Sequence, residues 1–413
     1  MKKCIAFLIL SALLFSLCAC RAQEPEPATT APGITMNWPQ INQKLTWDAI
    51  NAFPVKSEDM TVDQMRQLCV DFFYFSKTAL WIPDTNWNYT IASSGNSDQM
   101  FMGQIYGGLP YITNGGGNVY RLMDYMDETT GVVDMTVPIQ EPTLFGNQCS
   151  YGSYWGWARV INSAEFAATS NMTHSKGFLR VGPYTYDDSR LRFEKGGWDT
   201  KTIIQENGPE IMCQSSALTK LGDGLVLGGE GGHVMMIKTD PVVVYAADGT
   251  IDAAQSYLYI LDQHGAWTED TNEAGDTFTH KNYLNRKFTF NDLMAQGYIP
   301  FTFAEFLGTD PVEPTQCTFS HTGDTIRISQ LNEGIVTANY ALSDIYAQLK
   351  DKDGNVILSI PSRQNKPTMT LNFNRLIKSD EWSAYTTGEY TVEVVCQLGT
   401  GERLTVYTGT LVK

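Results

Sequence analysis

Apolar residues form several distinct patterns along this chain, and the first is a run near its start. Residues 5–17 are almost all apolar, follow two lysines and lead into Leu-Cys-Ala-Cys at 17–20. This layout is typical of a secretory signal peptide, and the run is too short to cross a hydrocarbon core of about 30 Å as a permanent helix. No other apolar run of the sequence is long enough to do so. We therefore expect residues 1–20 to be removed during export.

A helical period appears after residue 60. Thr61 and Gln64 have the spacing of a capping box. Apolar side chains then recur three and four residues apart, at Met65, Leu68, Cys69, Phe72 and Phe73. The pattern predicts a leading helical subdomain over residues 45–90. Because Cys69 lies on its apolar stripe, we expect a buried structural thiol there.

The middle of the chain has no single period. From residue 103 to about 307, Gly-rich turns alternate with one strongly aromatic helix and short β-branched runs. The regular repeat of a parallel sheet is missing, so the pattern predicts an α+β domain. Together with the helical extension, this domain would span residues 45–307.

The last part of the chain reads as short strands separated by turns. Residues 325–328 and 390–395 alternate as half-buried strands do, and Asp353-Gly354 and Gly399-Thr400-Gly401 have the composition of hairpin turns. We therefore predict an all-β, immunoglobulin-like sandwich over residues 312–413.

Charge narrows the choice of partners. The formal net charge is −16, and loss of the two signal-peptide lysines would make it −18. Nucleic acids and anionic lipids are bound through an excess of Lys and Arg, so we expect neither as a partner. With 43% hydrophobic and 12% aromatic residues, the composition is that of a globular protein.

The tetrapeptide at 17–20 also resembles a lipobox, in which a lipidated cysteine becomes the new N-terminus. Cys20 would be that cysteine; the alternative is an ordinary signal peptide cleaved after Ala-x-Ala. Residues 21–44 are then expected to be a tether, because their first part is rich in Pro, Glu, Ala and Thr and has little apolar surface. The resemblance implies an extracytoplasmic protein held at a bacterial membrane by its lipid anchor alone.

The number of cysteines implies at least one free thiol. Three of the eight cysteines belong to the export signal, and five remain: Cys69, Cys149, Cys213, Cys317 and Cys396. Because five is an odd number, at least one of them is unpaired. Cys317 and Cys396 could pair across the two sheets of the sandwich or stay as free thiols. No spacing of Cys or His suggests a zinc site, and we expect neither a metal nor a cofactor.

Cys149 is the candidate nucleophile. A turn of Gly146 and Asn147 leads into the aromatic helix, so the thiol is expected at a helix N-terminus, where the dipole and the free N–H groups favour the thiolate and an oxyanion. Cys213 lacks such an entry turn and is expected to be a small buried residue.

His233 is the candidate base, since a run of glycines precedes it and an apolar strand follows it. The other histidines are expected to be surface or core residues: His174, His280 and His321. Asp262 ends the next apolar strand and could orient the imidazole. Gln263 and His264 remain alternatives, because adjacent residues of a strand face opposite sides and the sequence does not show which of them faces His233.

These residues together resemble a known superfamily. Gly-Asn-Gln-Cys-Ser-Tyr at 146–151, with Trp157 and Arg159, is similar to the opening of CHAP amidase/peptidase domains. Leu-Gly-Asp at 221–223 and Gly-His-Val-Met-Met-Ile at 232–237 resemble their Gly-Asp turn and Gly-His-Val strand. Related NlpC-type hydrolases share the Cys-Ser and His-Val layout. The similarity covers roughly residues 100–270 and departs from the family in having Asp at 262 instead of Glu.

The resemblance implies a papain-like fold and a cysteine hydrolase that cleaves amide bonds of peptidoglycan peptides. Cys149, His233 and Asp262 would be its catalytic residues, and Gln148, Tyr111 and Trp155 would border the substrate. Residues 103–117 resemble the stretch ahead of the nucleophile in NlpC-type enzymes, although a structural loop is equally consistent with their composition. A binding protein on the same scaffold, or acyl transfer to an amine, are the alternative functions.

Overall fold

The computed structural model describes residues 38–91, 97–172, 175–186, 199–229, 231–310, 312–321, 327–373, 383, 385 and 387–413. The expected signal peptide, Cys20, most of the tether and His174 lie outside these residues. No helix within the described ranges is long and apolar enough to cross a membrane.

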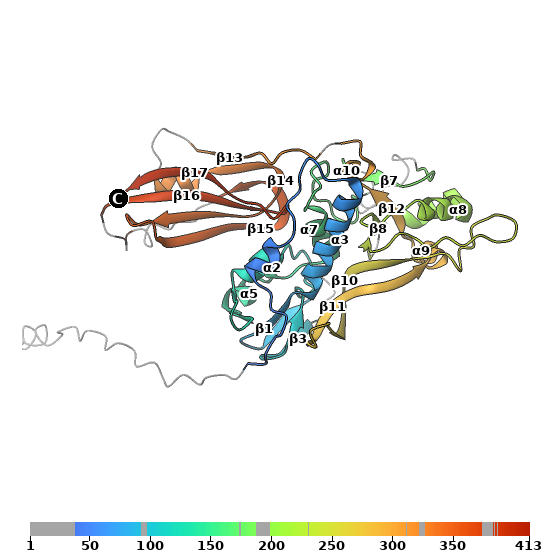
Figure 1. Ribbon diagram of the computed structural model, residues 1–413, viewed down its shortest axis with the longest axis horizontal. Helices are drawn as coiled ribbons and strands as arrows, with labels where there is room; N and C mark the ends of the chain where they lie inside the picture. Colours follow the sequence, from blue (N-terminus) through green and yellow to red (C-terminus); the bar gives the residue numbers. More distant parts are fainter. Residues whose placement is uncertain are drawn as a thin grey trace, which may run out of the picture. The chain divides into compact units, whose positions relative to one another are not determined.

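Helices and strands are mixed along the chain (Figure 1). The helices are α2 (Trp47–Asn51), α3 (Val62–Thr78), α4 (Val119–Met123), α5 (Thr136–Gln140), α6 (Pro142–Phe145), α7 (Cys149–Trp157), α8 (Thr200–Ala217), α9 (Phe290–Gln296), α10 (Ala304–Leu307) and α11 (Ile328–Asn332). The strands are β1 (Leu80–Pro83), β2 (Trp87–Thr90), β3 (Ser97–Met100), β4 (Tyr106–Gly107), β5 (Met126–Asp127), β6 (Val132–Val133), β7 (Leu179–Arg180), β8 (Gly224–Leu227), β9 (His233–Ile237), β10 (Tyr257–Thr271), β11 (Thr277–Thr289), β12 (Ile299–Thr302), β13 (Cys317–Ser320), β14 (Ile335–Lys350), β15 (Val356–Asn372), β16 (Glu389–Leu398) and β17 (Arg403–Val412).

Helix α3 confirms the helical pattern after residue 60. Thr61 and Gln64 form both bonds of the capping box, and the predicted apolar stripe is buried, with Cys69 fully inaccessible. The helical prediction is wrong for residues 80–90, which form β1 and β2. All four residues of β1 are buried, and an apolar run that short carries no period that could separate a strand from a helix.

A ten-stranded sheet forms the centre of the α+β part, in the order β5-β6-β1-β4-β11-β10-β9-β8-β12-β7. Neighbouring strands pair antiparallel except β1 with β6 and β4 with β11. Helix α7 packs against β9, β10 and α3, which lies beside it in Figure 1. Most of its aromatic residues share one core with most of the apolar stripe of α3. The mixed α+β class is therefore confirmed for this part of the chain.

The C-terminal part of the chain is built of β-strands, as predicted, but the strands are longer than the short ones expected. β14, β15, β16 and β17 are long, and together with β13 they hydrogen-bond into one five-stranded sheet. Both hairpin turns and the strand at 390–395 are confirmed. The strand expected at 325–328 is not: residues 322–326 lie outside the described ranges, and Ile328 begins α11. β14 was missed because polar Ser343 and Asp344 are buried in it and interrupt its alternation.

Residues Pro39–Lys413 form one compact unit. The C-terminal sheet and the α+β part meet through buried polar contacts, of which the ion pair between Arg121 and Asp344 is the most enclosed, with side chains 1% and 0% exposed. Within the C-terminal sheet, the thiols of Cys317 and Cys396 form a hydrogen bond with each other, so the two residues that could pair are adjacent.

Candidate active site

The structure brings Cys149, His233 and Asp262 together from three separate elements. Cys149 is the first residue of α7, His233 is the first residue of β9, and Asp262 lies in β10. β9 and β10 are neighbours in the sheet, and α7 packs on both of them. Residues far apart in the sequence therefore share one site.

Glycine packing positions the nucleophile. The N–H of Asn147 donates to the Pro110 carbonyl, and the Asn147 carbonyl accepts from Ile112, so the turn before Cys149 is tied to the preceding loop. A Cβ at Gly117 would lie 1.8 Å from the carbonyl oxygen of Phe145, and a Cβ at Gly115 would lie 2.4 Å from that of Gly146. Only glycine permits this approach, so the Gly-rich loop holds the turn that starts α7.

The imidazole of His233 is held by Asp262. Its Nε2 lies 2.8 Å from Oδ2 of Asp262, whose Oδ1 accepts the backbone N–H of Tyr283 at 3.2 Å. Asp262 is 2% exposed, whereas the side chain of His233 keeps 17% exposure. Since Nε2 is occupied, Nδ1 is the nitrogen that remains for the hydrogen bond between His233 and the Cys149 sulfur.

The electrostatics of the site favour a thiolate–imidazolium pair. Burial alone would raise the pKa of Cys149, but the His233 charge and hydrogen bonds from His233, the Val234 N–H and Tyr111 outweigh it and lower that pKa. Burial would likewise lower the pKa of His233, yet the Cys149 charge and the hydrogen bonds to Asp262 and Cys149 raise it to about 10. The two groups therefore favour each other's charged forms, the thiolate and the imidazolium.

This pair predicts a distinctive pH profile. Because the thiolate is the species that reacts, alkylation of Cys149 by iodoacetamide should show its inflection below the ordinary thiol value of about 8.5 and remain fast at pH 7. Hydrolysis also needs the imidazolium as an acid, so kcat/KM should fall as the pH rises through about 10. An alkylation profile with its only inflection at or above 8.5 would contradict the ion pair.

The three residues expected to border the substrate have different surroundings. Tyr111 is partly exposed, and its hydroxyl donates to Cys149 Sγ at 4.0 Å. Gln148 is also partly exposed, but its amide is used within the chain: Oε1 accepts the Asn114 N–H at 2.8 Å, and Nε2 donates to Ser150. Trp155 is 4% exposed and donates its indole N–H to the Gly116 carbonyl, so it belongs to the core and does not border an opening.

The alternatives to Asp262 do not contact the imidazole of His233. Gln263 is buried and bonds to Lys77 and to the Leu109 carbonyl. His264 stacks on Tyr283 with 3.8 Å between ring centroids, and its Nδ1 accepts the Ala266 N–H. A bulge in the pairing of β10 with β11 shifts the register here. For this reason the alternation of the strand could not show which residue faces His233.

The other thiols and histidines have structural surroundings. Cys213 is 4% exposed in α8, in a core cluster that does not include Cys149, and burial raises its pKa. His280 is 1% exposed and bonds to Asp270, and His321 packs against Phe319 and Tyr407.

Two residues at the site were missed by sequence reasoning. The ring of Tyr298 lies 6.4 Å from that of His233, and Lys77 is a buried cation on which the charges of Asp262 and Cys149 act. The sequence did not mark Lys77 as a site residue, because a lysine in the last turn of a helix is usually solvated and complements the helix dipole.

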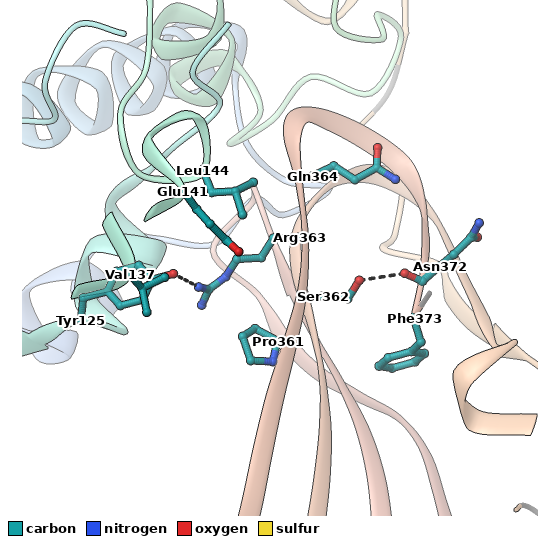
Figure 2. Close-up of a pocket in the computed structure, with 10 residues that line it drawn as sticks. All are labelled: Tyr125, Val137, Glu141, Leu144, Pro361, Ser362, Arg363, Gln364, Asn372 and Phe373. Atoms are coloured by element: carbon teal, nitrogen blue, oxygen red, sulfur yellow. Dashed lines mark hydrogen bonds between the residues drawn. The ribbon is translucent and has the colours of Figure 1, made fainter. Parts of the chain in front are cut away.

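The pocket in Figure 2 belongs to a different region. It has a volume of about 500 Å³, lies between β15 and the segment around α5 and α6, and includes Tyr125 and Arg363 but none of the three candidate catalytic residues. Around Cys149, which is itself 4% exposed, the side chains of Tyr111, Gln148 and His233 are partly exposed.

Within the described ranges, no group of three or more His, Cys, Asp or Glu side chains could hold a metal ion. What the site offers chemically is a paired thiol, imidazole and carboxylate. Comparison with known proteins adds no family: no family model matches the chain, and no curated protein or solved structure is significantly similar to it.

Proposed function

We propose that this chain is an exported, lipid-anchored cysteine hydrolase that cleaves amide bonds, with peptidoglycan peptides as the substrate class. The observation that carries the proposal is the His233–Asp262 pair at 2.8 Å, on the two strands against which α7, the helix that begins at Cys149, packs. A nucleophile beside a base that a third group orients is the arrangement that nucleophilic catalysis requires.

In the proposed reaction the Cys149 thiolate attacks the amide carbonyl carbon and forms a tetrahedral intermediate. His233 gives its proton to the departing amine, the C–N bond breaks, and the acyl group stays on the sulfur as a thioester. His233 then takes a proton from water, which attacks the thioester and releases the acid and the thiol. Asp262 holds the imidazole in the required orientation throughout.

The fold of the catalytic part would be papain-like, with the nucleophile helix packed against the strands that carry the base and its carboxylate. The packing of α7 on β9 and β10 supports this arrangement. For the C-terminal residues 312–413, the support for an immunoglobulin-like module is limited to the antiparallel order of the strands around their own core. Export and lipidation at Cys20 are supported by the sequence of residues 1–20.

The decisive experiment uses the chain without residues 1–20, incubated with purified peptidoglycan. We expect soluble fragments with new amino and carboxyl ends, identified by mass spectrometry, and no such fragments after iodoacetamide treatment. Fragments joined to an added amine would indicate acyl transfer. A folded protein that binds peptidoglycan, releases nothing and has an inert Cys149 would favour the binding scaffold and overturn the hydrolase.

A further inference from the structure

Lys77 places a buried ammonium group beside the candidate active site. It lies in the last turn of α3 and is 1% exposed. Its Nζ donates to Oε1 of Gln263 at 2.6 Å, and Gln263, itself inaccessible, follows Asp262 in β10. The hydrogen-bond partner is a neutral amide, so this contact alone does not balance the charge of the lysine.

The ammonium also lies against the nucleophile helix. A Cβ at Gly152, three residues after Cys149, would be 2.6 Å from Nζ of Lys77 and 2.9 Å from Oε1 of Gln263. Any side chain larger than hydrogen at 152 would therefore displace the lysine. The first turn of α7 passes directly over the ammonium because of this glycine.

A cation in this place needs negative charge nearby. Burying an ammonium is costly, and the N-terminal end of a helix carries a partial positive charge that adds to the cost. Two anionic groups face Lys77, Asp262 from β10 and Cys149 from α7, and both favour its charged form. The imidazolium of His233, from β9, opposes it. On its own helix, Phe73 presents its ring 4.9 Å from Nζ.

The effect between Lys77 and Cys149 is mutual. Burial lowers the pKa of Lys77 to about 7, although the charges of Asp262 and Cys149 act in the other direction. Because an electrostatic coupling between two sites is reciprocal, a thiolate that favours the protonated lysine is favoured by it to the same extent. Near neutral pH a substantial fraction of Lys77 carries its proton and can exert this effect.

Given the hydrolase function proposed above, on which this inference depends, we propose that Lys77 is a positioning residue of the site. Its ammonium, fixed by Gln263 under the start of α7, stabilises the Cys149 thiolate and the Asp262 carboxylate. The lysine does not touch the substrate; it acts through the charge that it places behind the nucleophile.

The test is the pH profile of Cys149 alkylation by iodoacetamide, followed by peptide mass spectrometry, in the chain without residues 1–20. We expect Lys77→Met to move the inflection upward by about one unit, which slows alkylation about tenfold at pH values below both inflections. Lys77→Gln keeps a donor for Gln263 but lacks the charge, so it should behave like Lys77→Met. A Lys77→Gln profile equal to that of the wild type would overturn the role of the charge.

Lys281→Met is the matched control. Lys281 is also 1% exposed, pairs with Asp98 and lies 4.7 Å from the centre of the Trp267 ring, away from the thiol. Its replacement should leave the alkylation profile unchanged, and circular dichroism of every variant verifies the fold. A wild-type thiol without a lowered inflection would refute the hydrolase site, whereas a lowered inflection that Lys77→Met leaves in place would refute only the inference about Lys77.

Discussion

On the function proposed above, replacing Cys149 by serine should lower the rate of amide hydrolysis by roughly four orders of magnitude or more, as loss of the nucleophile does in acyl-transfer enzymes generally. The hydroxyl is nearly the size of the thiol, so the 4% exposed position stays filled and the fold should persist. The hydroxyl ionises far less readily, however, and cannot form the charged pair with His233. The measurement is the initial rate of fragment release from peptidoglycan at pH 7.

Cys213→Ser is the control for this experiment. It makes the same chemical change at a thiol of equal exposure, in a core cluster that does not include Cys149. We expect the Cys213 variant to retain the wild-type rate if it remains folded. A Cys149→Ser protein as active as the wild type would remove Cys149 as the nucleophile.

Replacing Arg121 by methionine should lower the free energy of unfolding by about 3–5 kcal/mol, the usual cost of breaking a buried ion pair. Arg121 Nε donates to Asp344 Oδ1 at 3.0 Å, and its terminal nitrogens donate to three backbone carbonyls, at Ser343, Gly116 and Leu144. Methionine fills much of the space but leaves these carbonyls without a donor. Denaturant unfolding followed by tryptophan fluorescence measures the change.

Arg327→Met is the matched control, because Arg327 is exposed and its replacement should have little effect on stability. A change below about 1 kcal/mol in the Arg121 variant would mean that the buried pair contributes little, because its desolvation offsets its attraction. Arg363 also forms an ion pair with Asp344, at 2.8 Å, so the carboxylate keeps one cationic partner when Arg121 is replaced.

Arg121 also connects stability to the candidate site. It bonds the Gly116 carbonyl, which also accepts the indole N–H of Trp155 in the nucleophile helix. Gly116 itself lies against the C-terminal sheet, since a Cβ there would be 2.2 Å from the Asn365 carbonyl oxygen. The C-terminal sheet therefore supports the loop that holds the turn before Cys149, a contact that no pattern in the sequence indicated.

Local patterns were sufficient for the elements that carry the chemistry. The capping box and apolar period of α3, the start of α7 at Cys149 and the start of β9 at His233 are all as predicted. Each depends on residues close together in the chain: a cap, a glycine turn or a run of apolar side chains. Signals of this kind depend on a few neighbouring residues, so they can be recognised in the sequence without the tertiary structure.

Long-range packing decided the rest. The sequence left Asp262, Gln263 and His264 open, and the bulge in the β10–β11 pairing selects Asp262 as the partner of His233. Trp155, expected beside the substrate, is in the core, and the C-terminal strands hydrogen-bond into a single sheet. Burial, pairing register and the charge placed at Lys77 depend on contacts between residues that are 21 to 186 positions apart, and no local period encodes such contacts.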